Sequence, residues 1–271
     1  MHSISSWDTL FSVRPPAFDA LASALALLEG SRWPERGELQ KLMEAHRIVG
    51  GGGAPLRLTA PAAARESGRV PYELRVFDCG EVEHRDRDWH DLFNALVWLT
   101  FPSAKAALNA RHVQEIRAER DGRRSRTRDA LTLFDEEGVL VLSDDESLLS
   151  LIREFRWKDL FWRRRADVRR RMRFIPFGHA LYQKALQPFV GMVGRAILMP
   201  VAAQVLHGGA GERLAMLDGC LATDLAEPKM RSPQDLHPLP LLGIPGWFEQ
   251  GEQETFYDNR DYFRPGRRRA A

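Results

Sequence analysis

Apolar residues recur at three- and four-residue intervals in several parts of the chain, which is the spacing of one face of an amphipathic helix. The first such run follows Pro15-Pro16 and ends at Gly30; its apolar positions are Phe18, Leu21, Ala22, Leu25 and Leu28. A second helix is predicted from Trp33-Pro34 to the consecutive glycines at 50–53. A run of glycines favours a flexible joint, which would make residues 1–48 an N-terminal helical arm, and it is equally compatible with a surface loop within one domain.

Three other stretches favour β-structure. Residues 72–77 alternate apolar and polar side chains, as a half-buried strand does. Residues 130–134 and 139–142 are short apolar runs separated by Asp135-Glu136-Glu137-Gly138, an order typical of a hairpin with a glycine-containing turn. The three strands predict a small antiparallel sheet at about 72–77, 130–134 and 139–142.

The second half of the chain returns to helical spacing. A helix rich in arginine is expected through residues 160–172, and further helices from about 177 to 226. Residues 185–206 are mostly apolar over about the length that spans a bilayer, but two prolines and Arg195 interrupt them. Since a central arginine costs about 2.5–3.5 kcal/mol on membrane insertion, this stretch is predicted to be a pair of buried helices, and no membrane partner is expected.

Prolines punctuate the last part of the chain, at positions 228, 233, 238, 240 and 245. Because proline lacks a backbone N–H and interrupts helices, residues 228–271 are predicted to form an extended tail that wraps over the surface. The whole pattern predicts an α+β fold that is predominantly helical, with one small antiparallel sheet. A chain of 271 residues is long enough for one large domain, and we expect a single domain over 1–271.

Composition narrows the class of protein. Hydrophobic residues at 44% and charged residues at 28% are near globular averages, which argues against a disordered chain or a membrane bundle. Cys79 and Cys220 lie far apart, so thiolate zinc sites and CxxC redox chemistry are excluded. No serine elbow, Walker loop or dinucleotide-binding glycine pattern occurs. The first residues do not have the pattern of a signal peptide, so the predicted location is the cytoplasm.

Arginine clusters make the charge distribution uneven, although the net charge is only +2. Arginines gather at 111–128 and 163–173, and acidic residues at 135–137, 144–146 and 249–258. Two interpretations stay open: internal pairing of the two signs, or an exposed surface that binds phosphate groups. Because arginine triplets cannot all lie on one side of a helix at about 100° per residue, some are predicted to pair with the acidic turns.

The most distinctive polar residues lie in two consecutive helices predicted on either side of Phe101-Pro102. One face of the first helix carries His90, Asp91, Asn94 and Trp98. One face of the second carries Lys105, Asn109 and His112. If the two helices form an antiparallel hairpin, both polar faces contribute to one cleft, and we predict that His90, Asn94, Asn109 and His112 converge there.

Such a cleft suits metal or phosphate chemistry. Imidazole and carboxylate groups bind divalent ions, so the candidates for ligands or general acid–base groups are His90, Asp91 and His112. Amide and cationic groups orient a substrate and neutralise its charge, so the candidates for substrate binding are Asn94, Lys105, Asn109 and Arg128. Each residue also has a structural interpretation: Asp91 suits the first turn of a helix, the asparagines can tie backbone groups, and His112 can be a core histidine.

Other segments carry weaker signals. Asp135-Glu136 has an ordinary interpretation as a solvated turn, and His179 at a helix start favours its neutral form, as a base or a ligand. The His90-Asp91 dipeptide also invites comparison with HD-type metal phosphohydrolases, with His46 and Asp129 as further ligands. That match is weak, because the glycine run and the sheet do not fit an all-helical core.

Several motifs together resemble a protein family. They are Trp89 to Ala95 (WHDLFNA), Phe101-Pro102 with Lys105, Leu108-Asn109 and His112, Asp129 to Thr132 with Phe134-Asp135-Glu136, Phe177 to Ala180 (FGHA), and Gly243 to Trp247 (GIPGW). The set resembles a proteobacterial family catalogued as domain of unknown function 3025, with similarity from about residue 7 to 265. The resemblance implies one family-wide domain that is not divided at the glycine run. It implies no activity and no role for any residue.

Two hypotheses from different classes follow. In the first, the protein is a divalent-metal-dependent hydrolase that acts on a phosphorylated small molecule or on nucleic acid. In the second, it is a noncatalytic module that binds nucleic acid or protein through its arginine-rich surface, and the polar helices are structural. Convergent titratable groups in a concave pocket would favour the enzyme, whereas a solvated basic face without a pocket would favour the binding module.

Overall fold

A four-stranded sheet with helices around it forms the centre of the computed structural model, which describes residues 7, 16–28, 32–61, 70–119 and 123–266. The strands are β3 (Gly138–Ser143), β4 (Met172–Pro176), β5 (Val193–Pro200) and β6 (His237–Pro240), in the order β4-β3-β5-β6. β3 runs antiparallel to β4 and parallel to β5, and β6 runs antiparallel to β5. The predominantly helical α+β fold is therefore confirmed, but its main sheet is mixed.

β3 is a central strand because its sequence is apolar on both faces. All of its residues are buried, and Val141 lies opposite Phe174 of β4 and Leu198 of β5. A strand that is covered on both faces has a continuous apolar run in its sequence, as residues 139–142 do. The strand predicted at 139–142 is confirmed. Gly194 allows β5 to approach closely, since a Cβ there would lie 2.6 Å from Cγ2 of Val139.

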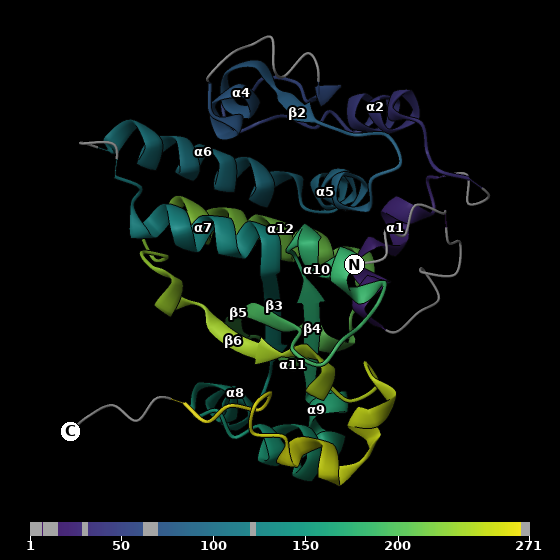
Figure 1. Cartoon of the computed structure of the whole chain (residues 1–271), viewed down its shortest axis with the longest axis vertical. Coiled ribbons are helices and arrows are strands. Elements are labelled where there is room, and N and C mark those ends of the chain that lie inside the picture. The colour runs from purple at the N-terminus through teal and green to yellow at the C-terminus, as the bar shows by residue number, and fades with distance from the viewer. Residues whose placement is uncertain (1–6, 8–15, 29–31, 62–69, 120–122, 267–271) are drawn as a thin grey trace.

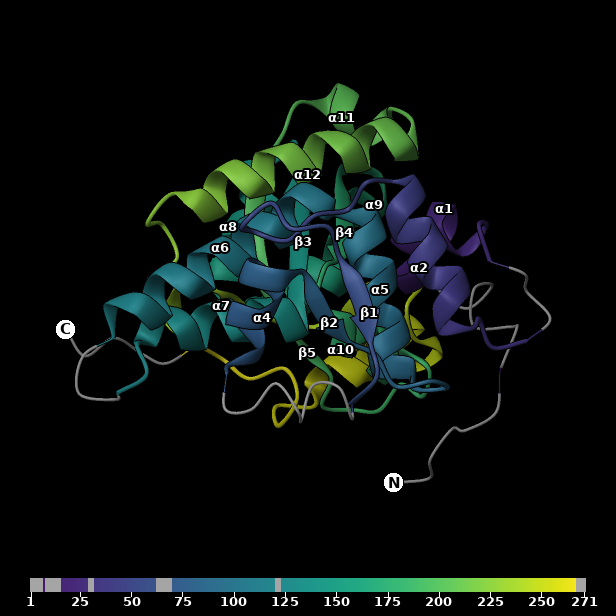
Figure 2. The same cartoon turned by 90° about the horizontal axis from the view of Figure 1, so that it is seen from above.

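Two layers of helices lie beyond the end of the sheet where β3 begins and β4 ends (Figure 1). The layer near the sheet contains α7 (Arg126–Glu137), α10 (His179–Ala185) and α12 (Ala210–Ala226), and the outer layer contains α5 (Trp89–Thr100) and α6 (Pro102–Ala118). α6 packs along α12, as the view from above shows (Figure 2), and α5 packs against α10. This stacking places the amino-terminal ends of α5 and α10 next to each other.

Smaller elements complete both ends of the molecule. Beside α5 and α6 lie the 3-10 helix η2 (Pro16–Leu21), α1 (Ala22–Leu25), α2 (Arg36–Ala45), α4 (Tyr72–Cys79), and the parallel pair β1 (Arg57–Thr59) and β2 (Glu81–Glu83). Toward the opposite end lie α8 (Glu146–Arg153), the π-helical turn η3 (Asp159–Arg163), α9 (Arg165–Arg171) and α11 (Ala203–His207). No helix in the described part of the chain is long and apolar enough to cross a membrane.

Residues 72–77 belong to helix α4, so the strand predicted there is wrong. Pro71 stands immediately before the first turn, and Gly80 ends the helix in the left-handed region at φ 70°. The helix buries Val76 against the rest of the protein. In so short a segment, strand alternation and helical spacing share positions, and the flanking proline and glycine were the more informative signals.

The strand predicted at 130–134 is also wrong, because these residues lie within α7. The Ser125 side chain caps this helix by accepting a hydrogen bond from the Arg128 amide, and the helix buries Ala130, Leu131 and Phe134. Gly138 ends α7 and begins β3. Asp135 and Glu136 therefore occupy the last helical turn and not a hairpin turn, because a five-residue apolar run does not by itself distinguish strand from helix.

One strand replaces a predicted helix, and another fills a gap between predicted helices. β5 takes part of the buried helix pair expected at 185–206, and β4 begins at Met172, where the predicted arginine-rich helix ends. Both strands pair with β3, and helices separate each of them from β3 in the sequence. Such pairing is a long-range interaction that local hydrophobic spacing does not reveal.

The glycine run at 50–53 is a closely packed loop, which corrects its interpretation as a flexible joint. A Cβ at Gly50 would lie 2.5 Å from the carbonyl oxygen of Val76, and one at Gly51 would lie 2.6 Å from that of Ala106. The absence of side chains lets the loop contact α4 and α6 directly. Gly50, Gly51 and Gly52 therefore let the loop backbone pack directly against the backbone of neighbouring helices.

The carboxyl-terminal part has more regular structure than the extended tail that its prolines predicted. Besides β6, residues 228–266 contain the 3-10 helices η4 (Pro233–Asp235), η5 (Leu241–Gly243), η6 (Glu249–Glu252) and η7 (Glu254–Asp258). β6 is an edge strand, a position where proline is tolerated. The Tyr262 hydroxyl donates to the backbone oxygen of Met192 and fastens this segment to the core, while the Tyr257 hydroxyl donates to Gly243 within the segment.

Candidate functional site

Helices α5 and α6 follow one another around Phe101-Pro102 as the sequence predicts, but the antiparallel hairpin is wrong, because α5 is seen end-on and α6 from the side in Figure 1. The Asp88 carboxylate caps α5 by accepting from the Asp91 amide, and Pro102 begins α6 directly after Phe101. The polar faces of the two helices open on one cavity of about 300 Å³, which we call the polar cleft. The predicted residues that line it are His90, Asp91, Asn94, Lys105, Asn109 and His112.

Further elements supply walls of the polar cleft, and of their residues the sequence indicated His179 as a base or ligand and Asp135-Glu136 as a solvated turn. α4 contributes Tyr72, Glu73 and Arg75, α7 contributes Thr132, Asp135 and Glu136, and the first residue of α10 contributes His179. These stretches of α4 and α7 were predicted to be strand or turn. The sequence therefore did not predict that their side chains face the cleft. Arg128, a predicted substrate contact, is not among the lining residues and instead pairs with Glu119 at 2.8 Å and Glu73 at 3.5 Å.

Lys105 is the buried cation of the polar cleft. Its side chain is only 4% exposed, and its Nζ donates to Asp135 Oδ1 at 2.5 Å and to Asn94 Oδ1 at 3.1 Å. Burial alone would raise the pKa of Asp135, but the adjacent ammonium of Lys105 holds that pKa below its usual value. Lys105 of α6 therefore compensates the buried Asp135 carboxylate. Its two hydrogen bonds also link α6 to Asn94 of α5 and to Asp135 of α7.

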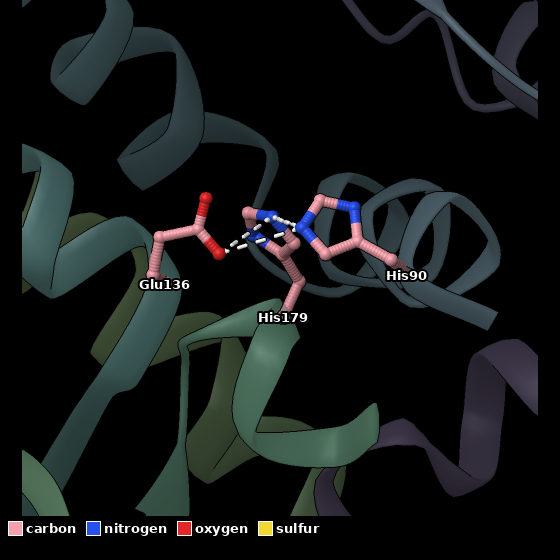
Figure 3. Close-up of side chains that lie close together, drawn as sticks. All are labelled: His90, Glu136 and His179. Carbon is pink, nitrogen blue, oxygen red and sulfur yellow. Dashed lines mark hydrogen bonds and ion pairs between the residues drawn. The ribbon is translucent and has the colours of Figure 1, made fainter. Parts of the chain in front are cut away.

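A triangle of ligand atoms lies where α5, α7 and α10 meet (Figure 3). His90 Nε2 is 3.1 Å from His179 Nε2, and Glu136 Oε2 is 3.4 Å from each of these nitrogens. In Figure 3 the three side chains point toward one another from three different elements. We call these three residues the His-His-Glu cluster.

The His-His-Glu cluster has the dimensions of a metal site. A tetrahedral zinc ion bound at about 2.0–2.1 Å separates neighbouring ligand atoms by about 3.3 Å, which agrees with the sides of this triangle. Two imidazoles and one carboxylate form a usual donor set for zinc and for other divalent transition metals. Three protein ligands also leave a further coordination position for water or substrate.

A glycine brings two of these ligands together. Gly178 precedes His179 at the start of α10, and a Cβ on it would lie 2.4 Å from the backbone oxygen of Glu136. The amide of Gly178 also donates to the backbone oxygen of Gly138 at 2.9 Å. The backbone contact between the start of α10 and the end of α7 thus depends on the glycine in the FGHA motif.

Asp91 supports the cluster from outside it. Its Oδ1 lies 3.2 Å from His90 Nδ1, and Arg85 donates to both carboxylate oxygens at 2.8 Å. Burial would raise the pKa of Asp91, but the hydrogen bonds from Arg85 and His90 hold it below its usual range. A carboxylate on the second nitrogen of a histidine fixes the ring and its tautomer, as it does for metal-binding histidines.

The two histidines of the cluster have opposite protonation preferences. The hydrogen bond to Asp91, followed by that to Glu136, raises the pKa of His90 to about 9, whereas burial lowers the pKa of His179 to about 4. With these values, a protonated His90 donates from Nε2 to the neutral His179. The same three atoms can therefore hold a proton or a divalent cation, and a metal ion would replace the proton on His90 Nε2.

His112 lies in the polar cleft but not in the cluster. It is 5% exposed, burial lowers its pKa, and its Nδ1 lies 4.0 Å from Glu73 Oε1. Among the residues that the structure describes, no hydrogen-bond acceptor contacts His112 Nδ1, Trp98 Nε1, or Nε and Nη1 of Arg75. Buried polar atoms without a hydrogen-bond partner are costly, so this wall of the cleft lowers the stability of the fold locally.

Asn109 has the structural role that was weighed against a catalytic one. Its Oδ1 accepts from the amide of Gly51 at 3.0 Å, and its Nδ2 donates to the backbone oxygen of Glu73 at 2.8 Å. The side chain thereby ties the glycine loop and α4 to α6. The HD-type arrangement is not formed, because His46 is exposed outside the cleft and Asp129 pairs with Arg124.

The arginine clusters are largely paired with carboxylates. Arg164 and Arg171 contact Asp145, and Arg171 also contacts Asp144, as the predicted pairing with the acidic turns requires. Carboxylate partners occur for Arg163, Arg164, Arg165, Arg169, Arg170 and Arg171. This pairing favours internal compensation over a free basic surface in α9.

Comparison with known proteins gives one match. A family model described as "Protein of unknown function (DUF3025)" matches residues 58–267, which include every residue of the polar cleft. No curated protein and no solved structure shows significant similarity to the chain.

Proposed function

The chain belongs to the DUF3025 family, whose description states no activity, and from the polar cleft we propose that it is a divalent-metal-dependent hydrolase acting on a phosphorylated substrate. The His-His-Glu cluster carries this proposal, because its ligand atoms lie 3.1 and 3.4 Å apart beside a cavity. A noncatalytic module that binds nucleic acid or protein through arginines is less favoured, since the arginines from 163 to 171 have carboxylate partners.

The chemistry of the donor set supports hydrolysis. A divalent ion at the cluster would polarise a phosphoryl oxygen and lower the pKa of a bound water toward neutrality. His90 and His179 would each offer Nε2, and Glu136 would offer Oε2. Asp91 would hold the His90 ring in place through Nδ1, and Arg85 would keep the Asp91 carboxylate ionised.

The other wall of the polar cleft supports an anionic substrate. Arg75, Arg85 and Lys105 line the cavity, and guanidinium and ammonium groups bind phosphoryl oxygens through charge-assisted hydrogen bonds. The volume of about 300 Å³ suits a small molecule or a single nucleotide unit. We therefore favour a small phosphate ester over a nucleic-acid duplex as the substrate.

His112 is the candidate for proton transfer. Burial keeps its imidazole neutral, and Glu73 lies close enough to its Nδ1 to receive or return a proton through a bridging water. Asn94 and Lys105 form the floor between His112 and the cluster, and Lys105 holds Asp135 next to Glu136. In this proposal His112 acts on the substrate, and the cluster acts through the metal ion.

Metal binding tests the cluster directly. Purified protein, stripped with a chelator and dialysed against Zn²⁺, is expected to retain one equivalent by elemental analysis. His179→Ala and Glu136→Gln are each expected to weaken Zn²⁺ binding more than 100-fold, since even outer-shell substitutions cost about 10–100-fold. His46→Ala, which removes an exposed histidine outside the cleft, is the matched control and should bind as the wild type does. Equal binding by all four proteins, or none by the wild type, would show that the cluster is only a hydrogen-bonded trio.

Hydrolysis tests the substrate class separately. The Zn²⁺-loaded protein is expected to release p-nitrophenol from p-nitrophenyl phosphate or its diester, and His179→Ala should abolish this release. His112→Gln should lower kcat while Zn²⁺ binding stays unchanged, because the residue lies outside the cluster. Cleavage of p-nitrophenyl acetate alone, with Zn²⁺ still bound, would overturn the phosphorylated substrate and keep the metal site. Cleavage of a single-stranded oligonucleotide but of neither phosphate ester would assign the substrate to nucleic acid.

A further inference from the structure

A second cavity of about 270 Å³ lies apart from the polar cleft and shares no lining residue with it. Its walls come from η2, α9, β4, the first turns of α12 and the loop after η5. The apolar part of the wall includes Met172, Leu214, Ile244, Pro245 and Trp247. We call this cavity the arginine pocket, because Arg169, Arg173 and Arg213 also line it.

Two of these arginines differ from the arginines that precede them. Every arginine from 163 to 171 lies within ion-pair distance of a carboxylate, and Arg169 contacts Glu252 at 3.0 Å. Among the described residues, no carboxylate lies within this distance of Arg173 or Arg213, although both face the same cavity. Burial and the nearby Arg213 lower the pKa of Arg173, as expected for a cation that is desolvated beside a like charge.

Neutral groups hold both arginines in place. Arg173 donates from Nη1 to the backbone oxygens of Met172 and Arg169 at 2.7 and 3.3 Å. Arg213 donates from Nη1 to the oxygens of Val205, Leu206 and Gly208 at 3.0–3.3 Å, at the end of α11. These carbonyls orient the guanidinium groups but remove none of their charge. The nitrogens other than Nη1 stay available for a ligand.

The remaining charged groups of the pocket do not neutralise this pair. Asp19 is the one carboxylate among the described lining residues, and it forms no ion pair with either arginine. Burial raises the pKa of Asp19, whereas an arginine in contact would lower it. The pocket therefore combines two uncompensated guanidinium groups, an apolar wall with an indole ring, and a carboxylate at a separate place.

We propose that the arginine pocket binds a small organic anion, whose phosphate or carboxylate group lies between Arg173 and Arg213 and whose apolar body lies against Trp247 and Leu214. Guanidinium groups bind such anions through charge-assisted and often bidentate hydrogen bonds. A cavity of about 270 Å³ accepts an anion of the size of one aromatic ring with its charged group. Asp19 favours a ligand that carries a hydrogen-bond donor away from its anionic group. This site does not depend on the proposed hydrolase activity.

Phenylphosphonate is a suitable probe, because it joins a ring to a phosphonate and has no ester bond to hydrolyse. Calorimetry is expected to show binding to the full chain, and Arg173→Gln and Arg213→Gln should each weaken it about 10-fold or more, as the loss of one charged contact predicts. Arg170→Gln is the matched control, since Arg170 pairs with Asp167 outside the pocket and should have no effect. His179→Ala should also have no effect, which separates this site from the polar cleft.

Three further measurements keep the proposal falsifiable if a glutamine variant folds poorly. Arg213→Lys keeps the charge and should lose less affinity than Arg213→Gln. Asp19→Asn removes the only described carboxylate of the pocket and should strengthen phenylphosphonate binding several-fold. Benzyl alcohol, which has the ring without the charge, should not bind. The proposal is overturned if phenylphosphonate fails to bind at about 10 mM, well above the Kd expected of such a site, or if Asp19→Asn weakens binding and the arginine variants leave it unchanged.

Discussion

The polar cleft and the arginine pocket have similar volumes, about 300 and 270 Å³, but opposite charge arrangements. In the polar cleft the buried charges have partners of opposite sign: Lys105 contacts Asp135, Asp91 contacts Arg85, and Arg75 lies 3.6 Å from Glu83. In the arginine pocket two cations share a cavity and are held by backbone oxygens. The comparison supports our two different proposals, a metal ion where the charges are compensated and an anion where two cations have no carboxylate partner.

The different charge arrangements of the two cavities predict which substitutions affect folding and which affect ligand binding. Removing one member of a buried pair leaves the other charge without compensation, so substitutions in the polar cleft should affect folding. Removing Arg173 leaves no carboxylate unpaired, so substitution there should affect binding more than folding. The following substitutions test this distinction, from the largest expected effect to the smallest.

Lys105→Met is expected to lower the free energy of unfolding by about 3–5 kcal/mol, because it strands the Asp135 carboxylate in a buried site. Denaturant titration measures the change. Lys184→Met is the control: its ion pair with Glu137 is equally short at 2.6 Å but the lysine is 38% exposed, so the cost should stay below about 1 kcal/mol. The Lys105→Met/Asp135→Asn double variant should recover part of the loss. Equal effects of the two lysine variants would contradict the view that compensation matters in the cleft.

Asp91→Asn is expected to weaken Zn²⁺ binding about 10–100-fold, as the loss of an outer-shell carboxylate does. The amide keeps the size of the side chain but no longer holds Arg85 as an ion pair or fixes the His90 tautomer. Competition with a chromophoric chelator measures the affinity. Asp78→Asn, which breaks an exposed pair with Arg117, is the matched control and should leave Zn²⁺ affinity unchanged.

Gly178→Ala is expected to destabilise the protein by about 1–3 kcal/mol, the usual cost of overpacking, and to reduce Zn²⁺ affinity as well. The new Cβ would lie 2.4 Å from the Glu136 backbone oxygen and would push His179 away from Glu136. Gly219→Ala in α12 has no atom within 4 Å of its new Cβ, and should be neutral or stabilising by up to about 1 kcal/mol. A wild-type Zn²⁺ affinity in Gly178→Ala would show that the backbone contact does not set the ligand geometry.

Arg173→Met is expected to change the free energy of unfolding by about 1 kcal/mol or less, because two hydrogen bonds to carbonyls are lost while the repulsion from Arg213 is relieved. Thermal unfolding with and without phenylphosphonate separates the two effects. The ligand should raise the melting temperature of the wild type more than that of the variant. A destabilisation as large as that of Lys105→Met would remove the contrast between the two cavities.

Local signals predicted the two consecutive helices that carry part of the polar cleft. Asp88 as a cap, Pro102 as a helix start and the spacing of His90, Asn94, Lys105 and His112 are short-range features, and α5 and α6 follow from them. The same features placed the polar faces of both helices on one cleft. The short apolar patterns at 72–77 and 130–134 wrongly predicted strands. Pro71 and Gly80 flank α4 and Ser125 caps α7, and these residues are the local signals for helix.

By itself, the sequence determined the predominance of helix, the buried strand at 139–142 and the candidate polar residues of α5 and α6, because each depends on the period of neighbouring side chains. Only the tertiary structure decided that Glu136 and His179 meet His90, and that Arg173 and Arg213 share a cavity. These residues lie far apart along the chain. Their distances depend on how α7, α10 and α12 stack on the sheet and on one backbone contact at Gly178, and no local period in the sequence encodes either.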